Sequence, residues 1–429
     1  MRRIKILCYH KILNSINDIN SINVSPENFE EQLRYLVNNF DVISLDNLEE
    51  EIHKDGKNAV AITFDDGCSD VLYNALPILE RYNVPATLFI TTGNIGIDKE
   101  NWMDDIIRCI MEPSIQQDVF VLEDEFVSCK WDSVTYEQKL ELYRSLNNIF
   151  RYSGVNRRKK YTDLLHSWSG RREEFRSDRR VLNELEIKKL SKNRLISIGA
   201  HTVTHPSLKW MSLDEKKYEI KGSIQKLKEI INRDISLFAY PFGSKNDFDD
   251  AVKEILKHQK IKYAFTTLTG ELNESTDNHA IPRSVVPNYS EEGFKKCICK
   301  LFNENSETEI KNNDNLKSFI TYIGKLENDK EIIENKTKFI IWGCGTYGKA
   351  LYKELEILGV ADNVIFYGDN NPNRKCTLCN GIKVLDSKEI KNVCSRQNVV
   401  ILVKGIYDWE ICLGLIKEEI RKIHIITRT

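Results

Sequence analysis

The segment Val60-Ala61-Ile62-Thr63-Phe64-Asp65-Asp66-Gly67 decides the fold class of the chain. A short apolar, β-branched run ends in two carboxylates and a glycine, as in a buried strand of a parallel sheet with polar groups at its carboxyl end. A helical pattern follows at residues 72–82, and a second apolar run occupies residues 86–91. This order of strand, helix and strand predicts an α/β protein with a parallel sheet or barrel covered by helices.

The alternation of predicted strands and helices continues, with one interruption, to about residue 300. A first strand is predicted at the N-terminus, and others at residues 195–200, 237–240 and 263–267. Residues 100–190 are charged and helix-rich, and we interpret them as a helical insertion that overhangs the carboxyl ends of the strands. We therefore expect a first domain at residues 1–300.

A second domain is expected after a polar connection. Residues 301–336 are rich in Asn, Glu and Lys, which predicts a linker that ends in a helix. A new apolar run starts at Lys338, so residues 337–429 are expected to form a small α/β domain.

Two histidines, four residues apart, follow the predicted strand at residues 195–200. They lie in the segment His201-Thr202-Val203-Thr204-His205-Pro206, in which the proline disfavours a helix and favours a tight turn. Strand ends of a parallel sheet meet at one edge, so both imidazoles can join Asp66 as ligands of an open, catalytic metal site. The neighbouring carboxylate, Asp65, points elsewhere in an extended segment and is predicted to be the general base. Either motif alone could be a simple turn or a chance pair.

Composition narrows the class of protein further. The 429 residues are 41% hydrophobic and 29% charged, with a net charge of −2, so a globular protein without a general attraction to nucleic acid is expected. Neither a transmembrane run nor a signal-peptide pattern is found, and the 11 cysteines show no disulfide framework. These features predict a cytoplasmic location.

At this point the residues resemble a known family, the polysaccharide deacetylases of the NodB-homology or carbohydrate esterase family 4 group. The resemblance covers about residues 4–290. Its motifs are Leu7–His10, Val24–Leu33, Thr63–Gly67, His201–Pro206 and Phe238–Gly243. It implies a distorted (β/α) barrel, usually seven-stranded, and hydrolysis of an N-acetyl group on an amino sugar with zinc or a similar divalent ion.

The family's site residues carry over position by position. The resemblance repeats the assignment of Asp65 as base and of Asp66, His201 and His205 as metal ligands. It adds the backbone N–H of Phe242 as a donor to the oxyanion that forms during hydrolysis.

The chain also departs from the family pattern at two roles. Many members have an arginine at the position of Ala239, where it orients the base; here Arg283 is the candidate replacement. The usual late motif with the general acid has no clean match, which leaves His279 as the first candidate and His10 as another, although either could be a packing or surface histidine.

Substrate contacts are expected from four residues: Tyr240, Pro241, Trp102 and Arg283. An aromatic ring near a sugar site can stack on the sugar, but Trp102 could equally be a buried helix residue.

The second domain contains a glycine-rich turn. Gly343, Gly345 and Gly348 follow a predicted strand and open a helix, and Asp369 ends the next strand. This context is typical of a dinucleotide-binding turn. The domain resembles short Rossmann-like domains appended to sugar-modifying transferases and methyltransferases, and the glycines could bind a nucleotide or nucleotide-sugar, or serve only close packing and assembly.

Taken together, the sequence predicts a metal-dependent hydrolase that removes an N-acetyl group from an amino sugar in a polysaccharide or glycoconjugate precursor. Its expected partners are this substrate and membrane-associated glycan assembly machinery. Two alternatives remain open: another amide hydrolase on the same scaffold, and a catalytically silent binding module.

Overall fold

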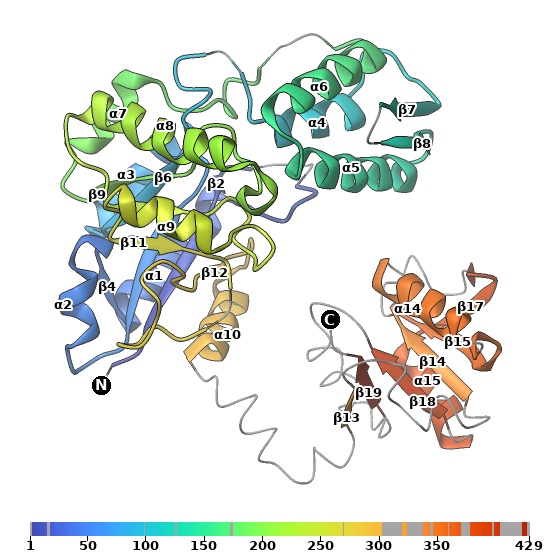
Figure 1. The fold of residues 1–429 in the computed structure, drawn as a ribbon. Coiled ribbons are helices and arrows are strands. Elements are labelled where there is room, and N and C mark those ends of the chain that lie inside the picture. The colour runs from blue at the N-terminus through green and yellow to red at the C-terminus, as the bar shows by residue number, and fades with distance from the viewer. Residues whose placement is uncertain are drawn as a thin grey trace. The chain divides into compact units, whose positions relative to one another are not determined.

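The computed structural model describes most of the chain and divides it into two compact units, Met1–Phe302 and Asn303–Thr429 (Figure 1). The described residues are 2–14, 18–97, 99–124, 127–171, 175–268, 270–302, 320–323, 338–343, 346–358, 360–369, 378–396, 399–403 and 423–426. Within them, no helix is both long and apolar enough to cross a lipid bilayer.

The first unit is built on an eight-stranded parallel sheet. The strands run in the order β11 (Tyr263–Phe265), β10 (Leu237–Ala239), β9 (Ile196–Ala200), β6 (Ala86–Ile90), β5 (Ala59–Phe64), β1 (Ile4–Tyr9) and β12 (Ser284–Val285), and β4 (Asp41–Ile43) also pairs with β5. The predicted strands at the N-terminus and at residues 60–64, 86–91, 195–200, 237–240 and 263–267 are therefore confirmed. Each is nearly fully buried, as expected for strands covered on both faces.

One segment connects the two ends of this sheet. Ile281 forms a parallel bridge with Phe265 of β11, and three residues later β12 pairs with β1. The sheet is therefore curled into a partial barrel, and the carboxyl ends of its strands surround a common centre. The expected α/β fold is thus confirmed as a parallel half-barrel, whose sheet has eight strands instead of the expected seven.

Helices cover the outside of the barrel (Figure 1). They are α1 (Pro26–Asn39), α2 (Leu48–Ile52), α3 (Leu76–Tyr82), α7 (Glu184–Ser191), α8 (Leu213–Ile231), α9 (Asp250–His258) and α10 (Glu291–Phe302), with short turns η1 (Leu45–Asn47) and η3 (Leu208–Trp210) and a small β2 (Lys11–Ile12) and β3 (Asn23–Val24) pair. Ser212 and Asn183 begin α8 and α7 with capping boxes, in which each cap side chain accepts the N–H of a glutamate that bonds back.

The helix predicted at residues 72–82 is divided in the structure. A wide π-helical turn, η2 (Val71–Ala75), precedes α3, which contains Pro77 in its first turn. Proline has no N–H to donate to the preceding turn, so a locally wider turn fits it better than a continuous α-helix.

The insertion has a core of its own and a strand pair that its sequence did not predict. Helices α4 (Trp102–Met111), α5 (Tyr136–Arg151) and α6 (Val155–Ser169) pack with an antiparallel hairpin of β7 (Val119–Glu123) and β8 (Ser128–Asp132). The insertion is helix-rich, as expected, and it also contains this hairpin. In β7 only Phe120 and Leu122 are buried, and β8 is mostly exposed, so the alternating signal is short and weak.

A buried ion pair joins the insertion to the barrel. The ammonium of Lys11, beside strand β1, contacts the carboxylate of Asp104 on α4, and both side chains are almost fully buried. Arg179 lies on the other side of the same carboxylate, with Nη1 at 3.5 Å. Burial alone would lower the pKa of Lys11, but the adjacent Asp104 raises it well above its ordinary value.

The second unit contains a seven-stranded mixed sheet. Its order is β13 (Ile320–Ile323), β19 (Ile423–Ile426), β18 (Val399–Val403), β14 (Lys338–Trp342), β15 (Val364–Gly368), β17 (Ile382–Leu385) and β16 (Leu378–Cys379). Neighbouring strands are parallel except for β16 and β17. The described helices are α14 (Thr346–Ile357), α15 (Ser387–Arg396) and the short η5 (Ala361–Asn363).

Strand β13 corrects the expectation of a linker at residues 301–336. It pairs in parallel with β19 and so belongs to the sheet of the second unit. Its four residues are surrounded in sequence by polar ones, which concealed it. The helix expected at the end of the linker lies outside the described residues.

Candidate functional site

The carboxyl ends of the barrel strands surround a pocket of about 360 Å³. Side chains from the barrel and from the insertion line it: His10, Asn20, Ile22, Asp65, Asp66, Met103, Asn147, Arg151, His201, His205, Phe242, Ser244, Thr267 and Val285. The pocket thus lies at the end of the sheet where parallel α/β folds collect their chemistry.

Asp66, His201 and His205 converge in this pocket. Oδ1 of Asp66 lies 3.6 Å from Nε2 of His201 and 3.3 Å from Nε2 of His205, and all three side chains are buried. Oδ1 of Asp66 and Nδ1 of His205 have no hydrogen-bond partner among the described residues. A buried carboxylate oxygen without a donor is costly unless a cation occupies the space before it, so this set of ligands fits a divalent metal ion.

The surroundings prepare these groups for a metal. Nδ1 of His201 donates to the backbone oxygen of Ala239 at 2.7 Å, which directs the lone pair of Nε2 into the pocket. Burial lowers the pKa of His201 to about 4, so its imidazole is neutral at pH 7. Burial favours protonation of Asp66, but contact with His205 outweighs it and holds the pKa of Asp66 well below its usual value.

Unusual backbone conformations hold the ligands in place. Asp66, Thr202, His205 and Phe242 all have a positive φ, between 57° and 73°. Non-glycine residues rarely adopt this conformation, and in folded proteins such residues concentrate at functional sites. The predicted tight turn before Pro206 is confirmed.

Side-chain hydrogen bonds fix the turn that carries the two histidines. The buried carboxylate of Glu219 on α8 accepts the N–H groups of Val203 and Thr204, at 2.9 and 2.8 Å. The hydroxyl of Thr202 accepts the N–H of His205 at 3.0 Å. These hydrogen bonds take the place of the backbone hydrogen bonds that a helix would provide. The turn can therefore position both imidazole rings without a helix.

Asp65 has a different partner from Asp66. Both of its oxygens accept from the guanidinium of Arg283, each at 2.7 Å, and both side chains are fully buried. Burial raises the pKa of Asp65, but the charges of Arg283 and His201 lower it to about 2 overall. Asp65 is therefore ionised at any physiological pH, and its position is fixed by a two-point contact.

Arg283 was expected to contact the substrate, and the structure contradicts this. It lies behind Asp65, where Nε donates to the backbone oxygen of Thr266 and Nη1 also donates to Thr63. It is absent from the lining of the pocket. It occupies the role suggested for it as the replacement of the arginine missing at Ala239.

His10 and His279 differ in their positions. A ring nitrogen of His10 lies within 4.8 Å of a carboxylate oxygen of Asp65, and its Nδ1 has no partner among the described residues. His279 is not part of the pocket lining, because its Nε2 lies 3.0 Å from the backbone oxygen of Ile261. The choice of His279 as first candidate for the acid is therefore not supported by the geometry.

Three residues expected to bind substrate are absent from the lining of this pocket: Tyr240, Pro241 and Trp102. Tyr240 is buried and donates its hydroxyl to the backbone oxygen of His279, and Pro241 is buried beside it. Trp102 does not line the pocket; it donates Nε1 to the backbone oxygen of His205 and packs 6.4 Å from the ring of Phe242. Phe242 itself does line the pocket, with its ring 4.9 Å from that of His205.

The insertion also contributes residues to the pocket that no sequence motif indicates. Asn147 and Arg151 lie one helical turn apart on α5, so both face the pocket. Nη2 of Arg151 donates to Asp247 and to the hydroxyl of Ser244, and its guanidinium lies 4.1 Å from the centre of the Phe242 ring. The side-chain oxygen of Asn147 is buried and has no partner in the described part of the chain. No motif marks these positions in the sequence.

In the second unit, the glycine-rich turn is only partly described. Gly343 follows β14 with φ of 96°, and its N–H donates to the backbone oxygen of Gly368. A Cβ on Gly348 would lie 1.7 Å from the oxygen of Gly343, so close packing alone requires this glycine. The N–H of Asp369 donates to Leu385, and Gly345 lies outside the described residues.

Comparison with known proteins agrees with the arrangement of the first unit. The family model described as polysaccharide deacetylase matches residues 53–116 and 164–264, which include both the aspartate and the histidine motifs. Both matched segments lie in the first unit, which is therefore similar to the polysaccharide deacetylases. The chain is a hydrolase that removes N-acetyl groups from polysaccharide, and the family that it resembles is metal-dependent.

Individual relatives are distant. The poly-beta-1,6-N-acetyl-D-glucosamine N-deacetylase of Staphylococcus aureus strain COL is 25% identical over 301 residues, 68% of this chain and 77% of that protein. Among solved structures, the Streptococcus pyogenes deacetylase PplD in complex with acetate has a TM-score of 0.44 and 19% identity, covering 68% of this chain and 97% of its own. IcaB from Ammonifex degensii has a TM-score of 0.43 and 18% identity, covering 70% and 98%.

Proposed function

We propose that the first unit removes N-acetyl groups from β-1,6-linked N-acetylglucosamine residues of a polysaccharide, with a divalent ion such as zinc held by Asp66, His201 and His205. The observation that carries this proposal is the buried oxygen of Asp66, which has no hydrogen-bond partner among the described residues and lies between the imidazoles of His201 and His205, next to a second carboxylate fixed by Arg283. The choice of sugar is supported by the named relative in Staphylococcus aureus.

In this reaction Asp65 accepts a proton from the attacking water. Because Arg283 holds its pKa at about 2, Asp65 is a weak base and needs an unusually acidic water. A bound divalent metal supplies that acidity and polarises the acetyl carbonyl. Arg283 keeps both oxygens of Asp65 in place, so the base does not have to be ordered during the reaction.

The remaining steps are the stabilisation of the oxyanion and the protonation of the leaving amine. The new bond joins the water oxygen to the acetyl carbon, and negative charge develops on the carbonyl oxygen. We assign the backbone N–H of Phe242 as a donor to this oxygen. The carbon–nitrogen bond then breaks, and we assign His10 to protonate the departing sugar amine, which leaves acetate as the second product.

Acetate release with metal-loaded full-length protein tests the proposal. We expect activity on β-1,6-linked N-acetylglucosamine oligomers, a lower rate on β-1,4-linked oligomers, and loss of both after chelation, with recovery on metal addition. Ammonia or ring-opened products from small amides would instead favour another amide hydrolase. Absence of bound metal together with absence of acetate from every sugar would favour a silent binding module.

For the site of action, we propose the cytoplasm and a nucleotide- or lipid-linked precursor near membrane-associated glycan assembly machinery. The support is the spacing of the 11 cysteines, which shows no disulfide framework. Cell fractionation tests this: enzyme recovered with the secreted or surface fraction would contradict it.

For the second unit, we propose a Rossmann-like domain whose turn after β14 binds a nucleotide or nucleotide-sugar. The support is the glycine motif followed by a helix and by Asp369 at the end of β15. Titration calorimetry with nucleotides and nucleotide-sugars tests it, and no heat from any of them would leave packing as the reason for the glycines.

A further inference from the structure

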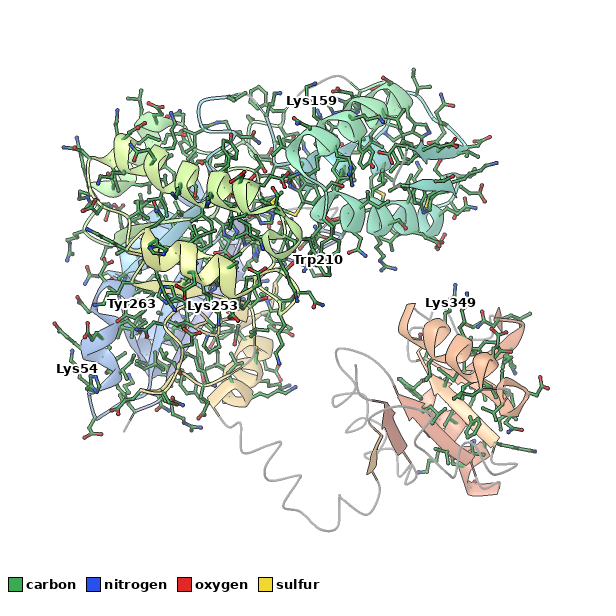
Figure 2. All side chains as sticks on the ribbon, viewed as in Figure 1. Lys54, Lys159, Trp210, Lys253, Tyr263 and Lys349 are labelled. Carbon is green, nitrogen blue, oxygen red and sulfur yellow. The ribbon has the colours of Figure 1, made fainter. Side chains whose placement is uncertain are left out.

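Two exposed aromatic side chains lie beside segments that line the catalytic pocket and have no role in the proposed chemistry. Trp210, on η3, is 61% exposed, and Tyr152, which ends α5, is 41% exposed. Their rings are 6.0 Å apart and nearly perpendicular. Figure 2 shows Trp210 on the side of the first unit where the insertion meets the barrel. An exposed aromatic pair is apolar surface that water does not favour.

Short connections join this pair to the pocket. Tyr152 directly follows Arg151, which lines the pocket. The backbone oxygen of Arg151 accepts the N–H of Ser207, three residues before Trp210. On the other side, Nε1 of Trp210 donates at 3.1 Å to the backbone oxygen of Asn246, two residues after the pocket residue Ser244. The rings therefore continue the pocket wall outward.

The pair is held in a defined orientation. Because the only polar atom of the Trp210 side chain is bonded to Asn246, the indole presents its apolar faces and cannot turn its N–H toward solvent without losing that bond. The guanidinium of Arg151 lies 5.4 Å from the centre of the Tyr152 ring, and the ammonium of Lys209 lies 5.7 Å from that of Trp210. Two cations therefore border the aromatic surface.

The size of the pocket indicates what this surface is for. About 360 Å³ is near the lower end of small-molecule pockets, so only a short part of a polymer can enter it. The neighbouring sugar units must lie over the rim. Pyranose rings have apolar C–H faces that stack on aromatic rings. A stable protein interface buries roughly 1,200 Å², far more than the surface of two side chains, so a sugar chain fits this surface better than a protein partner does.

We propose that Tyr152 and Trp210 form a stacking platform for sugar units adjacent to the unit in the pocket, so that the enzyme prefers polymer over short substrates. This inference rests on the proposed function. The ammonium of Lys209 adds a preference: chain that has already lost acetyl groups carries ammonium groups, which Lys209 repels, whereas Asp247 balances the charge of Arg151. The platform thus favours stretches that are still acetylated.

Chain-length dependence of the reaction tests the platform. The variants are Trp210→Ala, Tyr152→Ala and the conservative Trp210→Phe, and the matched control is Tyr136→Ala, at the opposite end of α5 and 60% exposed. The readout is kcat/KM for acetate release from N-acetylglucosamine oligomers of increasing length. We expect Trp210→Ala to lower kcat/KM about tenfold on long oligomers and to leave the shortest reactive oligomer unchanged, with Trp210→Phe near wild type.

The outcomes separate the platform from the function beneath it. If the wild type releases no acetate from any oligomer, the proposed function fails. If the wild type is active but Trp210→Ala keeps its full preference for long oligomers, or loses rate equally at every length, the platform fails. Sedimentation of wild type and Trp210→Ala tests whether the two rings instead bind a second copy of the chain. A dimer that only the wild type forms would show this and would contradict the platform.

Discussion

The two walls of the pocket are built in different ways. The barrel wall presents Asp65, Asp66 and His201 from strand ends, and all three are buried. Asp65 is paired with Arg283, and His201 donates to the backbone oxygen of Ala239. The insertion wall presents Asn147 and Arg151 from one helix, and both are half-buried. Arg151 pairs with the buried carboxylate of Asp247, whereas the side-chain oxygen of Asn147 has no partner in the described part of the chain. The barrel wall therefore has the rigidity that chemistry needs, and the insertion wall has the freedom that substrate recognition tolerates.

Removal of a metal ligand is expected to give the largest effect, because it destroys the barrel wall. His201→Ala should lose bound metal and lower turnover by about 10⁴-fold, since metal charge is worth several kcal/mol in such a transition state. Metal content by emission spectrometry and acetate release measure both. His258→Ala, an exposed histidine on α9, is the control. Retention of one metal per chain by His201→Ala would contradict the ligand assignment.

Substitution of the base, Asp65, should lower the rate of the reaction without loss of the metal ion. Asp65→Asn should keep the metal and lower kcat about 10³-fold, because the amide cannot accept the proton of the water. The measurement is the acetate rate at equal metal content. An unchanged kcat would mean that Asp65 is not the base, and simultaneous metal loss would mean that Asp65 helps to hold the ion.

On the insertion wall, a substitution should affect recognition alone. Asn147→Ala removes a buried amide whose oxygen has no partner in the described chain, so we expect KM for an oligomer to rise about 3- to 10-fold with kcat nearly unchanged. Asn148→Ala, the exposed neighbour on α5, is the matched control. A fall in kcat without a change in KM would show that the insertion takes part in the chemistry and would remove the contrast between the walls.

The smallest expected effect concerns the stability of the insertion. The hydrogen bond from His166 to Asp105, at 2.7 Å, raises the pKa of His166 to about 10. A raised pKa means that this stabilisation is complete below the unfolded pKa of about 6.5 and is lost as pH rises toward 10. We expect His166→Gln to lower the free energy of unfolding in urea by about 1–2 kcal/mol at pH 6.5, and by much less at pH 9.5. An equal difference at both pH values would exclude a role for the charge.

The barrel wall could be predicted from sequence because its residues belong to contiguous motifs. The strand before Asp65 and the turn around His201 each carry their own pattern of apolar and polar residues. Arg283 could be suggested but not placed, because its contact with Asp65 joins positions 218 apart in sequence. His279 was preferred to His10 as the acid because sequence alone does not show which strand ends face the pocket.

The insertion wall gave almost no sequence signal, for a physical reason. Asn147 and Arg151 are ordinary polar residues of an amphipathic helix, and only the packing of α5 against the barrel turns them inward. The hairpin of β7 and β8 also gave a weak sequence signal. Only two of its residues are buried in the insertion core, so the alternation of buried and exposed positions is short.

The ion pair between Lys11 and Asp104 limits how freely this enzyme could be re-engineered. Transplanting another protein's insertion onto this barrel would leave a buried ammonium without its carboxylate, a defect that typically costs about 3–5 kcal/mol. That is a large part of the stability of an average domain. A successful graft would therefore have to exchange Lys11 together with the insertion, so the two halves of the active site constitute a single inherited unit rather than interchangeable modules.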